Sequence, residues 1–149
     1  VAIETSDTIL IMDNAYSQNI KELVKTLEED HNNLLIEHSK VHRPWGWFEI
    51  LEEGDNFKVK RIQINPGKSI SLQRHQKRSE HWVVIKGSAS VINGEKTFNL
   101  KENESTFIEK KQIHRLSNKN NQILQIIEVQ SGVYLGEDDI ERISDLFAR

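Results

Sequence analysis

The sequence predicts a mainly β domain, a single antiparallel barrel or jelly roll, with a strand and a helix before it and a short helix after it. Three observations predict this class. Short apolar runs separated by turn residues follow one another from Gly46 onward. The Asn93-Gly94 dipeptide joins two of these runs, as in a tight β-hairpin. The 149 residues are 36% hydrophobic and 29% charged with two prolines, which indicates one globular domain with a sizeable core.

Before the β region, the pattern predicts one strand and one helix. Residues 8–12 form a short apolar run between polar residues, which is typical of a buried strand. Residues 15–30 carry apolar side chains at i, i+3, i+4 and i+7, so these side chains share one helical face. The face consists of Ile20, Leu23, Val24 and Leu27. A unit this small is marginal alone, so we expect the face to pack on another part of the protein.

The first part of the chain differs in pattern from the rest and does not begin with methionine. We interpret residues 1–36 as the tail of an upstream domain followed by a linker, and residues 37–149 as the main domain. The polar stretch 28–33 is the expected linker.

The main domain is expected to contain a series of short strands punctuated by turns. The strands are predicted at residues 46–51, 57–64, 69–74, 80–85, 89–92, 96–100, 105–108 and 123–129. The Asn93-Gly94 hairpin should adopt a type I′ turn, because both residues tolerate positive φ. A last helix is predicted over residues 137–147, with Ile140, Ile143 and Phe147 on one face.

Charge and composition exclude several classes of function. With 20 Lys and Arg against 23 Asp and Glu, the net charge of -3 offers no broad footprint for nucleic acid or an anionic membrane. No apolar run approaches the roughly 18 residues of a membrane span, and the start lacks the features of a signal peptide. We therefore expect a cytoplasmic protein. Because there is no cysteine, any metal must be held by His, carboxylate or amide oxygen.

One constellation could carry metal chemistry. Gln73 and His75 are two residues apart and so point to the same face of a strand. A four-residue polar turn then leads to Glu80, which an antiparallel hairpin can return to the side of His75. His114 follows much later in the chain. Two imidazoles, one carboxylate and one amide oxygen suit a divalent ion such as Zn²⁺, which could polarise a hydroxyl or carbonyl.

The order of these residues resembles the two motifs of the cupin barrel. Gly67, Gln73, His75, Glu80 and Gly87 follow the first motif, and His114 with Asn118 follows the second. The match has departures. Gln73 stands where a histidine is usual, and the second motif lacks its proline and glycine. Glutamine at that position resembles the phosphomannose isomerases, which use Gln, His, Glu and His around one zinc.

The resemblance then extends over nearly the whole chain, to the C-terminal part of the bifunctional mannose-1-phosphate guanylyltransferase/mannose-6-phosphate isomerase family. The segments that carry it are residues 43–47, 59–61, 71–73, 79–82, 114–116, 127–132 and 134–140. It implies a cupin jelly-roll barrel, a zinc ion held by Gln73, His75, Glu80 and His114, and a role in GDP-mannose and polysaccharide biosynthesis. The implied partners are the sugar phosphates mannose 6-phosphate and fructose 6-phosphate. A homodimer is left open.

In that family a guanylyltransferase half comes first and ends in a strand and a helix similar to residues 8–30. No Gly-rich nucleotide-binding start is present, so we do not expect this chain to bind GTP. The chain also ends in Phe-Ala-Arg where the family commonly ends in Tyr-Gly-Arg.

Two further residues are candidates for contact with the substrate, one from the resemblance and one from strand alternation. Arg78 matches an arginine of the family and is expected in an exposed turn, where it would contact phosphate or sugar oxygens and add little to stability. Lys60 faces the cavity if Ile62 and Ile64 face the interior, and would bind phosphate or move the proton. In the opposite register Val59 and Arg61 would point inward.

The tryptophans Trp45, Trp47 and Trp82 could form a wall of the pocket or simply belong to the core. The proton-transfer base stays open between Lys60, Glu80 and a metal-bound water. Three functions remain after this reasoning: a mannose-6-phosphate isomerase domain, a sugar-binding or regulatory cupin without catalysis, and another metal-dependent cupin enzyme.

Overall fold

The computed structural model describes residues 1–4, 9–30 and 40–144 of the chain. The chain divides into two compact units, Val1–Val41 and His42–Arg149. Among the described residues, no helix has both the length and the apolar character needed to cross a membrane.

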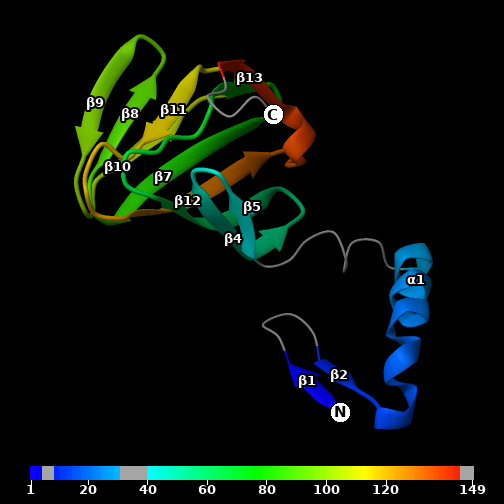
Figure 1. Cartoon of the computed structure of the whole chain (residues 1–149). Helices are drawn as coiled ribbons and strands as arrows, with labels where there is room; N and C mark the ends of the chain where they lie inside the picture. The colour runs from blue at the N-terminus through cyan, green and yellow to red at the C-terminus, as the bar shows by residue number, and fades with distance from the viewer. Residues whose placement is uncertain (5–8, 31–39, 145–149) are drawn as a thin grey trace. The chain divides into compact units, whose positions relative to one another are not determined.

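The first unit consists of a small hairpin and a helix. Strand β1 (Ala2–Glu4) pairs antiparallel with β2 (Ile9–Ile11), and a 3-10 turn at Asn14–Asn19 leads into α1 (Ile20–Asp30) (Figure 1). The side chain of Asp13 caps the turn by accepting a hydrogen bond from the backbone N–H of Ala15 at 2.8 Å. The predicted strand and helix are confirmed, whereas β1 was not predicted.

The apolar face of α1 is only partly covered within this unit. Leu23 and Val24 are 43% and 38% exposed, and Ile20 and Leu27 are half-buried. That the face packs on another part of the protein therefore stays a prediction. Residues 28–30 of the expected linker belong to the last turn of α1, and residues 31–33 and the boundary at 36 lie outside the described residues.

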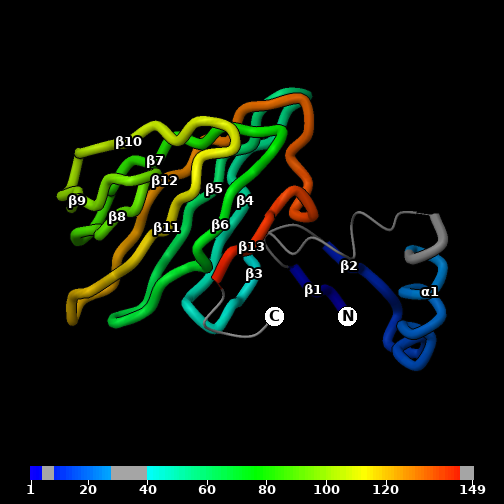
Figure 2. The backbone as a smooth tube through the Cα atoms, turned by 90° about the horizontal axis from the view of Figure 1, so that it is seen from above, coloured from blue at the N-terminus to red at the C-terminus, as the bar shows by residue number. Residues whose placement is uncertain are grey.

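The second unit consists of two antiparallel sheets. The six-stranded sheet has the order β10-β7-β12-β5-β4-β3, and the five-stranded sheet has the order β13-β6-β11-β8-β9. Figure 2 shows the two sheets as facing layers. The strands are β3 Lys40–Arg43, β4 Gly46–Gly54, β5 Phe57–Ile64, β6 Leu72–His75, β7 Arg78–Lys86, β8 Ala89–Asn93, β9 Lys96–Leu100, β10 Ser105–Ile108, β11 His114–Ser117, β12 Leu124–Gly132 and β13 Ile140–Ser144.

All the strands predicted for this unit are present. Strands β5, β9 and β10 have the predicted bounds, and the others differ by a few residues. Strands β3 and β11 were not predicted, because each has only four residues and little apolar alternation. The predicted hairpin between β8 and β9 is confirmed, but its turn is not type I′. Gly94 alone has positive φ, at 62°, and Gly94-Glu95 forms the two-residue loop, as in a type II′ turn.

The core lies between the two sheets and fills one end of the barrel. The buried apolar side chains of the six-stranded sheet include Ile64, Val84 and Ile126, and those of the five-stranded sheet include Val91 and Leu116. Along β5, β7 and β12 the inward side chains change from apolar to polar. The strand register therefore places a polar half beside an apolar half inside one barrel.

Three neighbouring strands build the polar half as cross-strand rows. Ile62, Ile126 and Val84 form the last apolar row, and Lys60, Glu128 and Trp82 form the next. The row beyond consists of Lys58, Gln130 and Glu80. Because inward residues alternate with outward ones, each row is two residues from the one before it.

The predicted helix over residues 137–147 is wrong in its described part. Glu137–Asp139 form a single 3-10 turn, and Ile140–Ser144 continue as β13, which pairs with β6. Strand β6 needs a partner on that edge, and backbone pairing with β13 supplies one. The pairing is held at Glu141, whose carboxylate accepts from Arg74 Nε and Nη2 at 2.8 and 2.6 Å. Phe147 lies outside the described residues.

Replacement of Glu141 by Gln tests this contact between β6 and β13. Hydrogen bonds from Arg74 and Gln76 lower the pKa of Glu141 from 4.5 to about 2. A carboxyl whose pKa is lowered by folding stabilises the folded state above its unfolded pKa, and this contribution disappears as the pH falls toward the folded value. The variant should therefore be less stable than wild type at pH 6, and the difference should vanish between pH 4.5 and pH 2.

The measurement is urea unfolding followed by tryptophan fluorescence, which reports the second unit because all three tryptophans lie there. Glu95→Gln, in the exposed turn between β8 and β9, is the matched control. A stability difference for Glu141→Gln that does not change with pH would contradict the assignment.

Candidate metal centre

The site is built around the carboxylate of Glu80, which is 1% exposed on the inner face of β7. Oε1 lies 3.0 Å from His75 Nε2 and accepts from Arg78 Nε at 3.1 Å. Oε2 lies 3.7 Å from His114 Nε2 and accepts from Trp82 Nε1 at 3.1 Å. Two imidazoles, a guanidinium and an indole thus meet at one buried carboxylate.

Both histidines turn the same nitrogen toward Glu80. His75 Nδ1 donates to the backbone oxygen of Asp139 at 3.4 Å, and His114 Nδ1 donates to that of Gln112 at 2.8 Å. A carbonyl can only accept, so these bonds place a proton on Nδ1, and the neutral form of each imidazole then has its lone pair on Nε2. His114 Nε2 is buried without a hydrogen-bond partner.

These features fit a divalent cation. Ligand atoms of His75, Glu80 and His114 lie within 4.8 Å of one another. Without a cation, the two Nε2 lone pairs would face a carboxylate in a buried site, which is unfavourable. Histidine nitrogen with one carboxylate oxygen is a donor set typical of Zn²⁺ and related ions. The three residues are therefore suited to hold a metal ion together.

Gln73, the fourth predicted ligand, lies beside this group. Gln73 lies on β6 as the cross-strand neighbour of His114 on β11, and its side chain is buried. Its Oε1 accepts a hydrogen bond from Ser71 Oγ at 2.8 Å. The strand alternation that was expected to put Gln73 and His75 on one face and Arg74 on the other is confirmed.

The electrostatics follow from burial and the crowding of charges. Burial alone would raise the pKa of Glu80. In the metal-free site, protonated imidazoles would oppose this through the hydrogen bond from His75 and the charges of both histidines, and together with Arg78 they hold the pKa well below its usual value. Burial lowers the pKa of His114, which favours the neutral imidazole that a metal requires. Burial and the neighbouring Glu80 raise the pKa of Glu128 to about 8.

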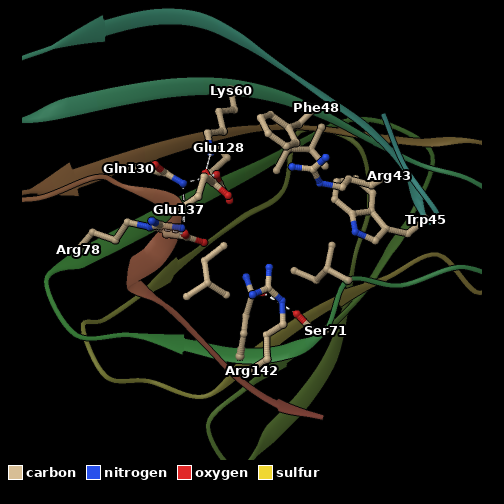
Figure 3. A pocket seen from close by; sticks show the side chains of 15 residues that line it. Arg43, Trp45, Phe48, Lys60, Ser71, Arg78, Glu128, Gln130, Glu137 and Arg142 are labelled. Atoms are coloured by element: carbon tan, nitrogen blue, oxygen red, sulfur yellow. Dashed lines mark hydrogen bonds and ion pairs between the residues drawn. The ribbon is translucent and has the colours of Figure 1, made fainter. Parts of the chain in front are cut away.

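A cavity of about 120 Å³ opens beside these residues in the polar half of the barrel (Figure 3). Glu128 lies on its wall, held by Trp82 Nε1 at 2.9 Å and by Gln130 Nε2 at 2.8 Å. Glu80 and Gln73 also line this cavity. A ligand in the cavity would therefore contact these two candidate metal ligands and a set of hydrogen-bonding side chains at once.

Lys60 points into this cavity, so β5 has the predicted register in which Lys60, Ile62 and Ile64 face inward. Lys60 is 4% exposed, whereas Val59 and Arg61 of the alternative register are only half-buried. Its ammonium forms an ion pair with Glu137 and lies 4.6 Å from the centroid of the Phe48 ring. The charge of Lys60 and its hydrogen bond lower the pKa of Glu137, although burial opposes this.

Arg78 lines the cavity, but the prediction of an exposed turn cation is wrong. Strand β7 begins at Arg78, where it pairs with Gly132 of β12, and the side chain is 2% exposed. Besides Glu80, the guanidinium donates to the backbone oxygen of Gly136 at 3.0 Å and lies 3.5 Å from His75 Nε2. Arg78 therefore holds the fold as well as the site.

The tryptophans separate into different roles. Trp45 is buried and lines the cavity. Trp82 is 1% exposed in the core, where its ring packs against that of His114 at a centroid distance of 5.5 Å. Trp47 is half-buried and does not line this cavity.

Several site residues were not predicted. Glu128 and Gln130 could have been found by extending the alternation of β12, in which every second residue from Leu124 faces inward. Asp139 accepts from the backbone N–H of Gln76 and Lys77 at 3.3 and 3.1 Å, and so fixes the connection between β6 and β7. Strand alternation does not indicate Asp139 or Glu137, because both lie in the 3-10 turn before β13 and their partners are distant in the sequence.

Asn118, the last residue of the second motif, has a structural role. Its side-chain amide donates to the backbone oxygens of Ile64 and Gln122 at 3.0 and 2.7 Å, and its Oδ1 accepts from the N–H of Asn120. It thereby links the loop after β11 to the end of β5.

Solved structures with a similar backbone fold define the class of fold. KdgF from Halomonas sp. aligns with a TM-score of 0.61 over 68% of this chain and 90% of that one, at 13% identity. A Klebsiella pneumoniae protein with a double-stranded β-helix domain aligns with a TM-score of 0.55 over 59% and 77%, at 21% identity. An oxalate decarboxylase from Lactobacillus farciminis gives 0.62 over 70% and 33%, at 18% identity. The second unit is thus a cupin, or double-stranded β-helix, with a His-Glu-His group inside.

The sequence comparisons show the particular family. Residues 29–145 match the family model described as mannose-6-phosphate isomerase C-terminal. Alginate biosynthesis protein AlgA of Pseudomonas putida is 46% identical over the whole chain, and xanthan biosynthesis protein XanB of Xanthomonas campestris is 44% identical. Mannose-1-phosphate guanylyltransferase RfbM of Salmonella typhimurium is 41% identical over 96% of the chain. The chain belongs to the mannose-6-phosphate isomerase C-terminal family, as its sequence resemblance indicated.

The chain spans 31% of the length of AlgA, 32% of that of XanB and 30% of that of RfbM.

Removal of the Arg78 guanidinium tests its revised role. Arg78→Met should destabilise the metal-free protein by about 3 kcal/mol or more, because breaking one partner of a buried ion pair leaves the other charge uncompensated. Arg61→Met is the control, since Arg61 pairs with Glu49 on the outer face and such pairs contribute about 1 kcal/mol or less. Chelator-treated protein is unfolded in urea, and equal losses for the two variants would contradict a structural role for Arg78.

Proposed function

We propose that this chain is a metal-dependent isomerase domain that interconverts mannose 6-phosphate and fructose 6-phosphate. The observation that carries the proposal is the pair of buried histidine Nε2 atoms directed at the Glu80 carboxylate beside a polar cavity. Membership of a family described as mannose-6-phosphate isomerase C-terminal supports the substrate.

The metal would be held by His75, Glu80 and His114, with the amide oxygen of Gln73 as a fourth ligand after its hydrogen bond to Ser71 adjusts. Zinc is the proposed ion, because the donor set combines imidazole nitrogen with oxygen. A bound divalent ion would supply Lewis-acid polarisation of the sugar oxygens on C1 and C2.

The side chains around the ligands have positioning roles in this proposal. Arg78 fixes Glu80 and neutralises part of its charge, so it is a positioning residue. Lys60 fixes Glu137 at the cavity wall. The ion pair gives Lys60 a positioning role, and the proposal assigns no residue as the proton-transfer base.

Glu128 and Gln130 complete the wall with fixed hydrogen-bonding groups. Gln130 Nε2 donates to Glu128 at 2.8 Å and lies 3.4 Å from Glu80 Oε1, and Trp82 holds both carboxylates. Such an interlocked set keeps its geometry without reorganisation, which favours orientation of sugar hydroxyl groups next to the metal.

The larger setting is also a proposal. The relatives named for alginate, xanthan and guanylyltransferase functions are about three times as long as this chain. We propose that the chain serves as the isomerase part of GDP-mannose and polysaccharide biosynthesis in the cytoplasm, and that residues 1–36 belong with an upstream guanylyltransferase domain.

The test is a coupled assay for fructose 6-phosphate formed from mannose 6-phosphate by the zinc-loaded chain. Wild type should turn over, and Glu80→Gln should lower kcat/KM by more than about 100-fold, because changes even next to metal ligands cost 10- to 100-fold. Glu49→Gln, on the outer face of β4, should match wild type.

Binding of mannose 6-phosphate is measured alongside turnover. A zinc-loaded chain that binds the sugar phosphate but does not convert it would overturn the isomerase proposal in favour of a non-catalytic sugar-binding cupin. Turnover that persists in Glu80→Gln would overturn the proposed site.

A further inference from the structure

We propose that Arg43 and Arg142, both of them exposed, together bind the phosphate group of a sugar phosphate at the rim of the cavity. This inference rests on the proposed function, and it assigns the phosphate to residues other than those predicted from the sequence. Both side chains line the cavity, and Figure 3 shows both guanidinium groups directed into it from different walls.

The strand register fixes the direction of Arg142. Arg142 on β13 is the cross-strand neighbour of Gln73 on β6, and Gln73 is the neighbour of His114 on β11. Side chains of directly paired residues lie on the same face of a sheet, so Arg142 shares the inner face with Gln73. The residue is exposed, which places it where the inner face meets solvent.

The same register gives the spacing from the metal ligands. Arg142 lies two strands from His114, and adjacent strands are about 5 Å apart, so the two backbones are separated by roughly 10 Å. A six-carbon sugar phosphate has its reactive carbons at one end and its phosphate at the other. Such a ligand can therefore reach the metal ligands and Arg142 at the same time.

Arg43 approaches from the other sheet. It lies on β3, the edge strand of the six-stranded sheet, whereas β13 is the edge strand of the five-stranded sheet. Its guanidinium carbon is 5.5 Å from the centroid of the Phe48 ring, and Nη1 donates to the backbone oxygen of His42 at 3.2 Å. Among the described residues, no carboxylate forms an ion pair with Arg43.

The two cations that the sequence suggested for phosphate are engaged elsewhere. Lys60 is paired with Glu137, and Arg78 uses its nitrogens on Glu80, Gly136 and His75. A phosphate at Lys60 would have to displace the carboxylate of Glu137, and one at Arg78 would lie next to the buried carboxylate of Glu80, where like charges repel strongly. Arg43 and Arg142 are on the other side of the cavity from Glu128 and Glu137 in Figure 3.

Two guanidinium groups suit a phosphate monoester. Each presents a planar set of donors that can bind two phosphate oxygens, and the ester carries up to two negative charges. Groups that approach from separate sheets would contact different oxygens of the same phosphate. The pair would therefore select phosphorylated sugars over neutral ones.

The experiment compares equilibrium binding to wild type, Arg43→Gln, Arg142→Gln and the outer-face control Arg61→Gln. The probes are mannose 6-phosphate, inorganic phosphate and mannose, measured by calorimetry, with KM for mannose 6-phosphate measured separately. Arg43→Gln and Arg142→Gln should each weaken the binding of mannose 6-phosphate about tenfold, because a hydrogen bond to a charged group is lost at a partly exposed site. Arg61→Gln should have no effect.

Specific outcomes separate the phosphate site from general effects. Arg142→Lys should weaken binding less than Arg142→Gln because it keeps the charge but not the planar fork. Mannose binding should be the same in all variants, and inorganic phosphate should compete only where both arginines are present. Unchanged affinity for mannose 6-phosphate in both Gln variants, with unchanged melting temperatures, would overturn the proposal.

The result also distinguishes this inference from the proposed function. If wild type binds mannose 6-phosphate without turnover and the arginine variants lose that binding, the phosphate site stands and the isomerase proposal fails. If wild type turns over and neither variant changes KM or affinity, the isomerase proposal stands and the phosphate site is wrong.

Discussion

The buried carboxylate of Glu80 is the constraint on which the rest of the site depends. A charge that is 1% exposed must be compensated. Arg78 compensates it directly, and His75 and His114 do so as protonated imidazoles or through a cation that they share with the carboxylate. Each compensating group is fixed from outside: His75 by the Asp139 carbonyl, His114 by the Gln112 carbonyl and Arg78 by the Gly136 carbonyl. The loops that carry these carbonyls are thereby tied to the metal site, so the site and the end of the barrel are stabilised together.

The barrel itself is divided along its strands into an apolar half and a polar half. The apolar half provides the burial that stabilises the unit, with Trp82 at the boundary, where its ring packs on His114 and its Nε1 contacts Glu80 and Glu128. The polar half is costly to bury unless it is fully hydrogen-bonded or bound to ligands. A metal ion at one side and a phosphate at the other would satisfy its charges, which connects the fold to the proposed chemistry.

Much of the fold and the ligand set could be predicted from the sequence, because both depend on local patterns. Alternation in β5 reduced the direction of Lys60 to two registers, of which the structure has the inward one. The order of Gln73, His75, Glu80 and His114 gave the candidate ligands, which the barrel brings close together. The predictions for Arg78 and the last helix failed for a different reason. Both segments are set by pairing with distant strands, β12 and β6, which local periodicity does not report. The ion pair of Lys60 with Glu137 likewise joins residues that are far apart in the sequence.

Titration of the metal-free chain with cobalt(II), followed by visible absorption and calorimetry, tests the central claim most directly, because cobalt(II) takes the nitrogen and oxygen ligands of a zinc site and reports them spectroscopically. Wild type should bind one ion per chain with a spectrum that includes imidazole ligation, and zinc should displace the cobalt. Glu80→Gln should lose this binding, while Glu49→Gln on the outer face should keep it. Absence of stoichiometric binding in wild type, or equal binding by Glu80→Gln, would contradict a metal centre built around Glu80.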